Sequence, residues 1–441
     1  MPIQRENQQS IILLAGAVTV LLAILLYLLS PSLIPASSAA QGTKVYFADR
    51  ISSAHRKIID RFNQLHQGKI EVVPVDLPFE KFSTNERKEL LARTLRSKSD
   101  KIDVFCVDLI WVQRFARWCE PLDQHIPLEQ REGILPLALA SCFSESSLVA
   151  MPLLIDIGLM YYREDVIARL PDAAAVEQRL RESITWPEFL RLRDRLGYSR
   201  KPFYVFQADE YEGLVCNYLE IVKAMDSDAL VSDRIDLDTP AARSALQLLV
   251  DLVHKKGVSP MKVTQFDEIR SYVYMLDNDA VFLRGWPNFV ENFRTRYPDT
   301  IRLNSIRKAA LPHFEGSAPT SVFGGWNLML SKYSTRKPEA LEFIRFVETK
   351  EAQQLLYECE GFLPVVKSIY GDSAYMASHP DLAYYHGLLQ RGFHRPSLVD
   401  YTRISDVLSH YVRLAILGDL SVEEALHNAS RMISENKVLI K

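Results

Sequence analysis

Short apolar runs alternate with amphipathic helical segments over the first part of the chain beyond residue 42. Residues 44–48, 69–75 and 102–107 are apolar runs of the length of a strand. A serine-capped amphipathic helix is predicted between the first two, and a charged helix over residues 80–97 before the third. This β-α-β-α-β order predicts the start of an open parallel sheet.

Polar residues follow these predicted strands at their carboxyl ends, where open parallel sheets bind ligands. Asp49 comes directly after the first strand, and a run from Asp108 to Trp111 follows the third. We therefore expect Asp49, Asp108 and Trp111 to lie near a ligand. The alternative for Asp108 is that it only caps the turn or helix that follows it.

A further apolar run over residues 323–330 contains Gly324, Gly325 and Trp326. Glycines allow a backbone to come close to a neighbouring group, and the run after them predicts a buried strand. A helix with Pro338 in its first turn is predicted next. An indole placed by glycines on such a strand is a candidate ligand platform, and a packed core indole is the alternative.

The Gly324-Gly325-Trp326 run, its strand and the helix that continues through residues 339–347 resemble a signature of the extracellular solute-binding proteins of carbohydrate ABC importers. The trehalose- and maltose-binding type is the most similar branch, and the resemblance covers nearly the whole chain after the first forty residues. It implies an α/β, two-lobed, periplasmic-binding-protein-like (type II) fold. Each lobe would be a mostly parallel sheet flanked by helices, with the ligand cleft at the hinge.

The same resemblance implies residues of a sugar site. Residues 151–163 match the segment that crosses from the first lobe to the second, which makes Asp156 a ligand residue. A stacking aromatic is expected at Trp286, and a loop returning over the cleft makes Arg395 a candidate, with a surface salt bridge as its alternative. The pattern around Glu212 resembles the trehalose/maltose branch, although packing within a helix would also explain this glutamate.

The implied division of the chain has three parts. Residues 1–43 would be an N-terminal anchor or signal segment with a linker. Residues 44–155 with 308–335 would form lobe 1, and residues 156–307 with 336–441 would form lobe 2 with returning C-terminal helices. We expect the second crossing between the lobes near residues 305–310.

The N-terminal segment contains nineteen uncharged residues, 11–29, which at about 1.5 Å per residue approach the thickness of a bilayer core. Ser38-Ala39-Ala40 would also suit a signal peptidase. An uncleaved membrane anchor and a removed signal peptide therefore both stay open. Either one predicts that residues 41–441 lie outside the cytoplasm.

The net charge and the cysteine content bear on the classes of partner and cofactor that this protein can have. The formal net charge of −3 argues against nucleic acid as a partner, because a nucleic-acid-binding face is basic. Five cysteines without a C-x-x-C pair indicate mostly free buried thiols, although one disulfide from Cys106 or Cys119 to Cys142 is possible. No metal-ligand spacing is present in the sequence, and no metal or cofactor is expected.

The residues and the resemblance together predict a sugar-binding protein without catalytic residues. Aromatic rings would cover the apolar faces of a sugar while carboxylates and a guanidinium bind its hydroxyls. The expected partners are a small-molecule sugar, an ABC permease with its cytoplasmic ATPase, and the membrane through the N-terminal segment. The alternatives are a secreted sugar-cleaving enzyme that uses Asp108 and Asp156, and the same fold with a non-sugar solute.

Overall fold

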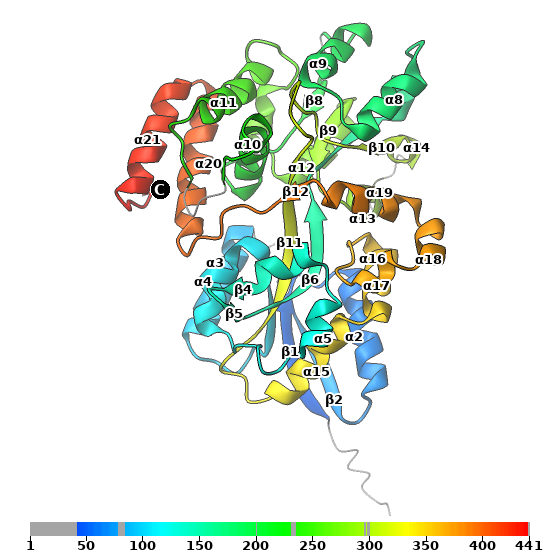
Figure 1. Ribbon diagram of the computed structural model, residues 1–441, viewed down its shortest axis with the longest axis vertical. Coiled ribbons are helices and arrows are strands. Elements are labelled where there is room, and N and C mark those ends of the chain that lie inside the picture. The colour runs from blue at the N-terminus through cyan, green and yellow to red at the C-terminus, as the bar shows by residue number, and fades with distance from the viewer. Residues whose placement is uncertain are drawn as a thin grey trace, which may run out of the picture.

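Two lobes stacked end to end make up the protein, each built on its own sheet (Figure 1). The computed structural model describes residues 42–77, 84–199, 201–230, 235–294, 297 and 300–439. The predicted two-lobed α/β fold is confirmed. The lower lobe contains the predicted β-α-β-α-β unit, and the upper lobe carries the last two helices of the chain.

The lower sheet has the order β12-β11-β3-β1-β2, with β6 also pairing with β11. Strand β1 pairs in parallel with β2 and β3, whereas β11 runs antiparallel to β3 and β6. The elements of this lobe are β1 (Thr43–Asp49), α2 (Ser53–Leu65), β2 (Ile70–Asp76), α3 (Thr84–Arg96), β3 (Val104–Asp108), α4 (Val112–Phe115), α5 (Leu128–Glu132), α6 (Pro136–Leu139), β4 (Phe143–Ser144), β5 (Ser147–Leu148), β6 (Met151–Ile157), β11 (Ser321–Leu330), α15 (Lys337–Val347), α16 (Lys350–Glu360) and α17 (Lys367–Tyr370).

The upper sheet has the order β10-β7-β9-β8. Its pairings are antiparallel for β10 with β7 and for β7 with β9, and parallel only for β8 with β9. The elements of this lobe are β7 (Leu159–Arg163), α7 (Glu164–Ile167), α8 (Ala173–Glu182), α9 (Trp186–Arg195), β8 (Tyr204–Val205), α10 (Glu212–Met225), α11 (Pro240–Val253), α12 (Glu268–Asp277), β9 (Phe282–Gly285), α13 (Phe289–Phe293), α14 (Thr300–Asn304), β10 (Ile306–Ala309), α20 (Tyr401–Leu417) and α21 (Val422–Ser434). The expectation of a mostly parallel sheet was therefore wrong for this lobe.

The hinge consists of neighbouring backbone segments that pass between the lobes. The chain first crosses at Gly158, between β6 and β7, within the segment 151–163 where a crossing was expected. The start of β11 lies beside this crossing: the Gly158 amide donates to the Val322 carbonyl at 3.0 Å, and the Ser321 hydroxyl donates to the Gly158 carbonyl at 2.5 Å. Strand β12 (Gly392–Phe393) pairs with the same end of β11. The hinge is therefore bound together by backbone pairing.

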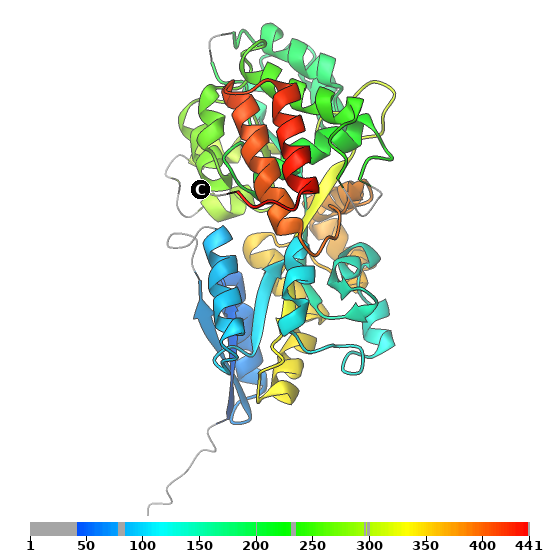
Figure 2. The same ribbon diagram turned by 90° about the vertical axis from the view of Figure 1, so that its left-hand side faces the viewer.

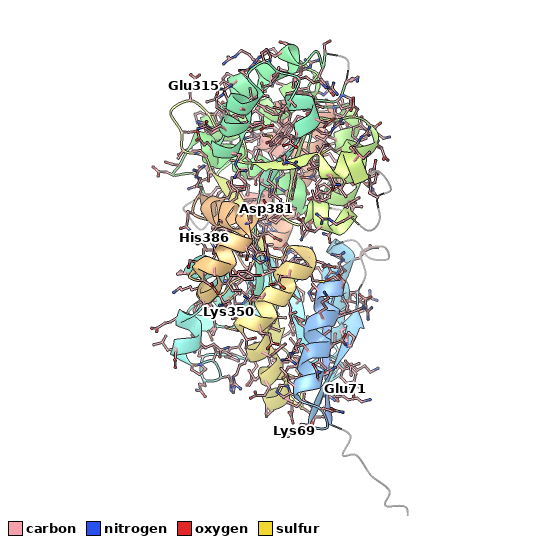
Figure 3. The ribbon with its side chains drawn as sticks, turned by 90° about the vertical axis from the view of Figure 1, so that its right-hand side faces the viewer. Lys69, Glu71, Glu315, Lys350, Asp381 and His386 are labelled. Atoms are coloured by element: carbon pink, nitrogen blue, oxygen red, sulfur yellow. The ribbon has the colours of Figure 1, made fainter. Side chains whose placement is uncertain are left out.

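Two boundaries differ from the sequence-based division. Residues 306–309 form β10 inside the upper sheet, so the second crossing comes at β11 and not near 305–310. Helices α15 and α16 pack on α2, β1 and β11 of the lower lobe, although residues 336–441 were expected in lobe 2. The reason is the apolar face of α15, whose buried side chains cover the lower sheet. Helices α18 (Ser373–Ser378) and α19 (Pro380–Leu389) follow, and Figure 3 shows Asp381 and His386 of α19 at the level where the lobes meet.

Thr185 and Ser421 begin α9 and α21, and each forms a capping box with the glutamate three positions later. Trp186 is buried against Phe189 and Tyr204. All five cysteines are free thiols. Across the described residues, no helix combines the length and the apolarity needed to span a bilayer. The predicted anchor or signal segment lies outside the described residues.

Candidate functional site

One face of the lower sheet carries the core of the candidate site. Strand β11 lies between β6 and β3, with Gly324 opposite Asp156 and Trp326 opposite Asp108. Side chains at directly paired positions project from the same face of a sheet, and so do residues two apart on one strand. The sheet therefore places two carboxyl groups on either side of the strand that carries the indole.

Gly325 has a structural reason to be glycine. Its φ of +141° is rarely adopted by other residues, and an added Cβ would lie only 2.6 Å from the Leu154 carbonyl oxygen. The pairing of β11 with β6 shifts in register immediately afterwards, between Trp326 and Asn327. This irregularity therefore lies directly beside Trp326.

Aromatic and cationic side chains surround Trp326. Its ring meets the Trp111 ring edge to face, with 6.3 Å between the centroids. The Arg87 guanidinium lies 4.9 Å from the centroid of Trp326, and the Lys88 amine lies 5.4 Å from that of Trp111. Burial lowers the pKa of Lys88. Both cations come from α3, which therefore packs against one side of the indole pair.

Asp49 lies behind this cluster. It is 3% exposed, and its carboxylate accepts a hydrogen bond of 2.8 Å from Arg87 and lies 3.3 Å from His55 Nε2. Burial alone would raise the pKa of Asp49, but the His55 and Arg87 side chains outweigh this effect and hold the pKa below its ordinary value. The geometry makes Asp49 the residue that orients Arg87 over Trp326.

Among the carboxyl groups of this site, Asp156 receives no hydrogen bond from the part of the chain that the structure describes. Its Oδ1 is buried and accepts no hydrogen bond from any described residue. Burial, together with the nearby charge of Asp108, raises the pKa of Asp156 to about 7. A buried acceptor without a donor is costly in free energy, so a ligand that supplied a donor would bind favourably here.

Trp286 reaches this face from the upper lobe, directly after β9. A Cβ on Gly324 would lie 2.8 Å from the Trp286 ring and 3.2 Å from the Asp156 Cβ, so the glycine makes room for the indole. The ring is supported from behind by the Arg284 guanidinium, 4.0 Å from its centroid, and its Nε1 donates to Glu268 at 3.4 Å. Indoles from both lobes thus border the carboxyl group of Asp156.

The segment after β12 brings Arg395 between the lobes. Arg395 is 3% exposed, donates to Glu212 at 2.6 Å, and lies 3.5 Å from Asp108. Glu212, the first residue of α10, also accepts hydrogen bonds from the hydroxyls of Tyr401 and Ser405. Burial raises the pKa of Asp108, and the Arg395 charge opposes that rise. Arg395 therefore connects a lower-lobe carboxylate to an upper-lobe one, and it is a buried ion-pair residue, not a surface one.

A second buried ion pair joins the Trp286 platform to the hinge. Arg284 is 0% exposed and donates to Glu220 at 2.8 Å. The same Glu220 oxygen accepts from the Ser321 hydroxyl at 3.2 Å and from the Val322 amide at 3.3 Å, at the start of β11. The contacts run continuously from the indole face to a hinge strand.

A comparison with known families now identifies the kind of protein. The family model described as bacterial extracellular solute-binding protein matches residues 47–354. The chain belongs to this family. Its members bind a solute outside the cytoplasm for an ABC transporter, and that location and role apply to this solute-binding protein as well.

Individual relatives agree with this assignment. A probable ABC transporter-binding protein of Deinococcus radiodurans is 25% identical over 335 residues, which are 75% of this chain and 78% of the relative. A solved structure of T. maritima MalE3 with bound maltose is 27% identical, with a TM-score of 0.80, and the match covers 90% of this chain and all of that one. The GacH receptor of Streptomyces glaucescens, at 17% identity and a TM-score of 0.75 over 89% of this chain and 98% of its own, shares the fold.

The structure brings all nine residues expected at the site into one region of contacts, although their ligand-binding roles stay predictions. They are Asp49, Asp108, Trp111, Asp156, Glu212, Trp286, Gly325, Trp326 and Arg395. Asp49 and Glu212 are occupied by protein partners, which makes them positioning residues. The sequence reasoning missed Arg87, Lys88, Glu220 and Arg284. In the sequence, Arg87 and Lys88 are part of a charged helix and Arg284 stands two positions before Trp286. Neither pattern shows which side chain these residues contact.

Proposed function

We propose that residues 44–441 bind an oligosaccharide, with a disaccharide such as trehalose or maltose as the favoured candidate, and deliver it to an ABC permease. The observation that carries the proposal is the unpartnered Asp156 oxygen bordered by Trp286 from one lobe and by the Trp326 strand from the other. The maltose seen in the matched T. maritima protein supports the choice of sugar.

The chemistry of a pyranose matches these groups. Its C–H faces are apolar and suit the indoles of Trp286 and Trp326, while each hydroxyl can donate to a carboxylate or accept from a cation. Hydrogen bonds to charged groups contribute about 1.5–3 kcal/mol, which offsets the free-energy cost of removing water from the Asp156 carboxylate. A phosphate-bearing solute would instead meet two carboxyl groups on the same sheet face.

Closure of the lobes is the proposed signal to the permease. A ligand that contacts Trp286 above and Asp156 and Trp326 below stabilises the closed arrangement over an open one. The Arg395 contacts to Asp108 and Glu212 stabilise the same arrangement. An N-terminal membrane anchor would keep the closed form close to the permease and raise its effective concentration there.

Isothermal titration calorimetry of the purified protein against trehalose, maltose, cellobiose, ribitol and a polyamine tests this proposal. We expect a dissociation constant below about 1 mM for at least one disaccharide and none for the polyamine. Tight binding of the polyamine, or no saccharide binding at millimolar concentrations, would refute the sugar assignment.

The alternative of a sugar-cleaving enzyme has one observation in its favour. Glycoside hydrolases pair an acid of raised pKa with a second carboxylate, and the pKa of Asp156, near Asp108, is about 7. Overnight incubation with maltose or trehalose distinguishes the two functions. A binding protein leaves the concentration of glucose unchanged, and an enzyme releases glucose in a way that Asp156→Asn abolishes.

A further inference from the structure

Helices α2 and α3 lie on opposite sides of the lower sheet (Figure 1), and Figure 2 shows that α3 begins at the level where the lobes meet. Asp49, the last residue of β1, joins the first turns of these two helices. It accepts a hydrogen bond from Arg87 of α3 and lies 3.3 Å from His55 Nε2 of α2. His55 is therefore connected, through Asp49, to the cation that stacks on Trp326.

His55 stands at the third position of α2, where it closes a capping box. The backbone amide of Ser52 donates to His55 Nδ1 at 3.4 Å, and the Ser52 hydroxyl lies 2.7 Å from the same nitrogen. Because a backbone amide can only donate, Nδ1 must accept, and the proton of the neutral ring lies on Nε2. The helix cap therefore directs the N–H side of the imidazole to Asp49.

A histidine at this position differs from the other two capping boxes in the part of the chain that the structure describes. The boxes of α9 and α21 use Glu188 and Glu424, the residue type that capping boxes ordinarily contain. A glutamate in place of His55 would bring a second carboxylate beside Asp49 and would compete with it for Arg87. Histidine closes the box and still presents a donor to Asp49.

The ring of His55 is held on two sides by aromatic side chains. It meets Phe362 edge to face at 5.7 Å between centroids and lies 6.2 Å from Phe47. The contact of Nε2 with Asp49 Oδ2 is too bent for a hydrogen bond, so it acts electrostatically. His55, Asp49 and Arg87 are all at most 4% exposed, and electrostatic contacts are strong where water is excluded.

We propose that His55 is a positioning residue for solute binding, which holds Asp49 in the orientation that keeps the Arg87 guanidinium over Trp326. This inference rests on the proposed function, in which Trp326 is a ligand platform. The guanidinium lies 4.9 Å from the centroid of the indole, and the attraction of a cation to a ring face depends on this placement. His55 thus acts on affinity through Asp49 and Arg87, not through the solute.

A double-mutant cycle tests this route. Calorimetric titration with maltose compares the wild type, His55→Leu, Arg87→Gln and the double variant. We expect His55→Leu to weaken binding about tenfold in the wild type and less than about twofold in the Arg87→Gln background, because both changes act through one contact. His55→Gln, which retains an amide donor and a capping-box residue, should recover most of the affinity.

His66→Leu is the matched control. His66 is the histidine at the other end of α2, where its ring stacks on Phe62 at 4.0 Å and its Nδ1 lies 3.0 Å from the Phe62 carbonyl oxygen. The same substitution there removes an imidazole from the same helix without touching Asp49. We expect the affinity for maltose to stay at the wild-type value.

Two measurements without sugar examine the platform itself. Near-ultraviolet circular dichroism reports the packing of aromatic side chains, and the signal lost in Trp326→Phe belongs to the pair that Trp326 forms with Trp111. His55→Leu should change that signal, and His66→Leu should retain it. Nuclear magnetic resonance of the wild type with ¹⁵N-labelled histidine, assigned with His55→Gln, should show the Nε2-protonated form of His55.

The outcomes separate this inference from the proposed function. If the wild type binds maltose and His55→Leu has no effect, or an equal effect in both backgrounds, the positioning role is wrong and the proposed function stands. If no saccharide binds the wild type, the proposed function is wrong, and with it the role of His55 in sugar binding. An Nδ1-protonated ring, or an indole signal that His55→Leu leaves unchanged, overturns the positioning role whether or not a sugar binds.

Discussion

The protonation of Asp156 gives a quantitative test of the site. Its pKa of about 7 lies well above the ordinary value of 3.8, because burial and the nearby charge of Asp108 disfavour the carboxylate, and its buried Oδ1 accepts no hydrogen bond from a described residue. Between about pH 4 and pH 7 the folded protein therefore holds a proton that the unfolded chain has released. Folding stability must then fall as the pH rises through this range, and it levels off above it.

The size of this loss of stability follows from the difference between the folded and the ordinary pKa of Asp156. Each pKa unit corresponds to about 1.36 kcal/mol, so the charged form of Asp156 costs on the order of 4 kcal/mol of stability above pH 7 relative to pH 4. Asp156→Asn removes the charge and retains the shape. We expect the free energy of unfolding of the wild type, minus that of the variant, to decrease by about this amount between pH 4 and pH 7.5.

Urea denaturation of both proteins at several pH values, followed by circular dichroism, measures this difference. Other titrating groups cancel because both proteins contain them. A difference that stays constant, or that grows in favour of the wild type as the pH rises, would refute the assignment of a buried, unpartnered Asp156.

Asp156 should also lose part of its proton when a ligand contacts it. A sugar hydroxyl that donates to Asp156 stabilises the carboxylate and lowers its pKa, so binding near pH 6.5 should release a fraction of a proton. Titrations in buffers of different ionisation enthalpy detect this release. Its absence, or an equal release by Asp156→Asn, would show that the ligand does not reach this carboxyl group.

Three further predictions concern single residues. Trp326→Ala should weaken sugar binding about 30-fold, because truncation of a central aromatic residue costs about 2 kcal/mol. The control Trp186→Phe, at a buried packing residue, should leave the affinity unchanged. Equal affinities of the wild type and Trp326→Ala in calorimetry would contradict a role of Trp326 in binding. Arg395→Gln should lower the free energy of unfolding by about 3 kcal/mol, because it removes the cation that Asp108 and Glu212 share. Urea titration measures this loss. The control Arg270→Gln, which breaks an exposed ion pair, should cost under about 1 kcal/mol. Gly325→Ala should destabilise by at least about 2 kcal/mol because of its φ and the nearby Leu154 carbonyl, and a melting temperature equal to that of the wild type would refute this reasoning.

Local sequence signals predicted much of the lower lobe. The serine cap of α2, the three strands up to Asp108 and the glycines before Trp326 depend on residues close together in the chain, and the structure has them where expected. The crossing at Gly158 lies within the segment 151–163 that the resemblance to the family indicated. These features follow from backbone conformations that few residue types satisfy.

The features that sequence reasoning missed depend on partners far apart in the chain. Residues 306–309 look like any short strand, and only their pairing with β7 places them in the upper sheet. Arg284 is separated from Glu220 by 64 positions, so nothing local indicates that the two form a buried pair. Helix α15 has an apolar face that would suit either lobe, and its packing on β1 and β11 decides between them.

Under the proposed function, the buried pair of Arg284 and Glu220 would couple ligand binding at Trp286 to lobe closure. Arg284 supports the Trp286 ring on one side and donates to Glu220 on the other, and Glu220 holds the Ser321 end of β11. Isolated buried charges are expensive, so Arg284 and Glu220 constrain each other and the groups they contact. A ligand that bound Trp286 as proposed would therefore contact a side chain that is linked to the hinge through Arg284 and Glu220.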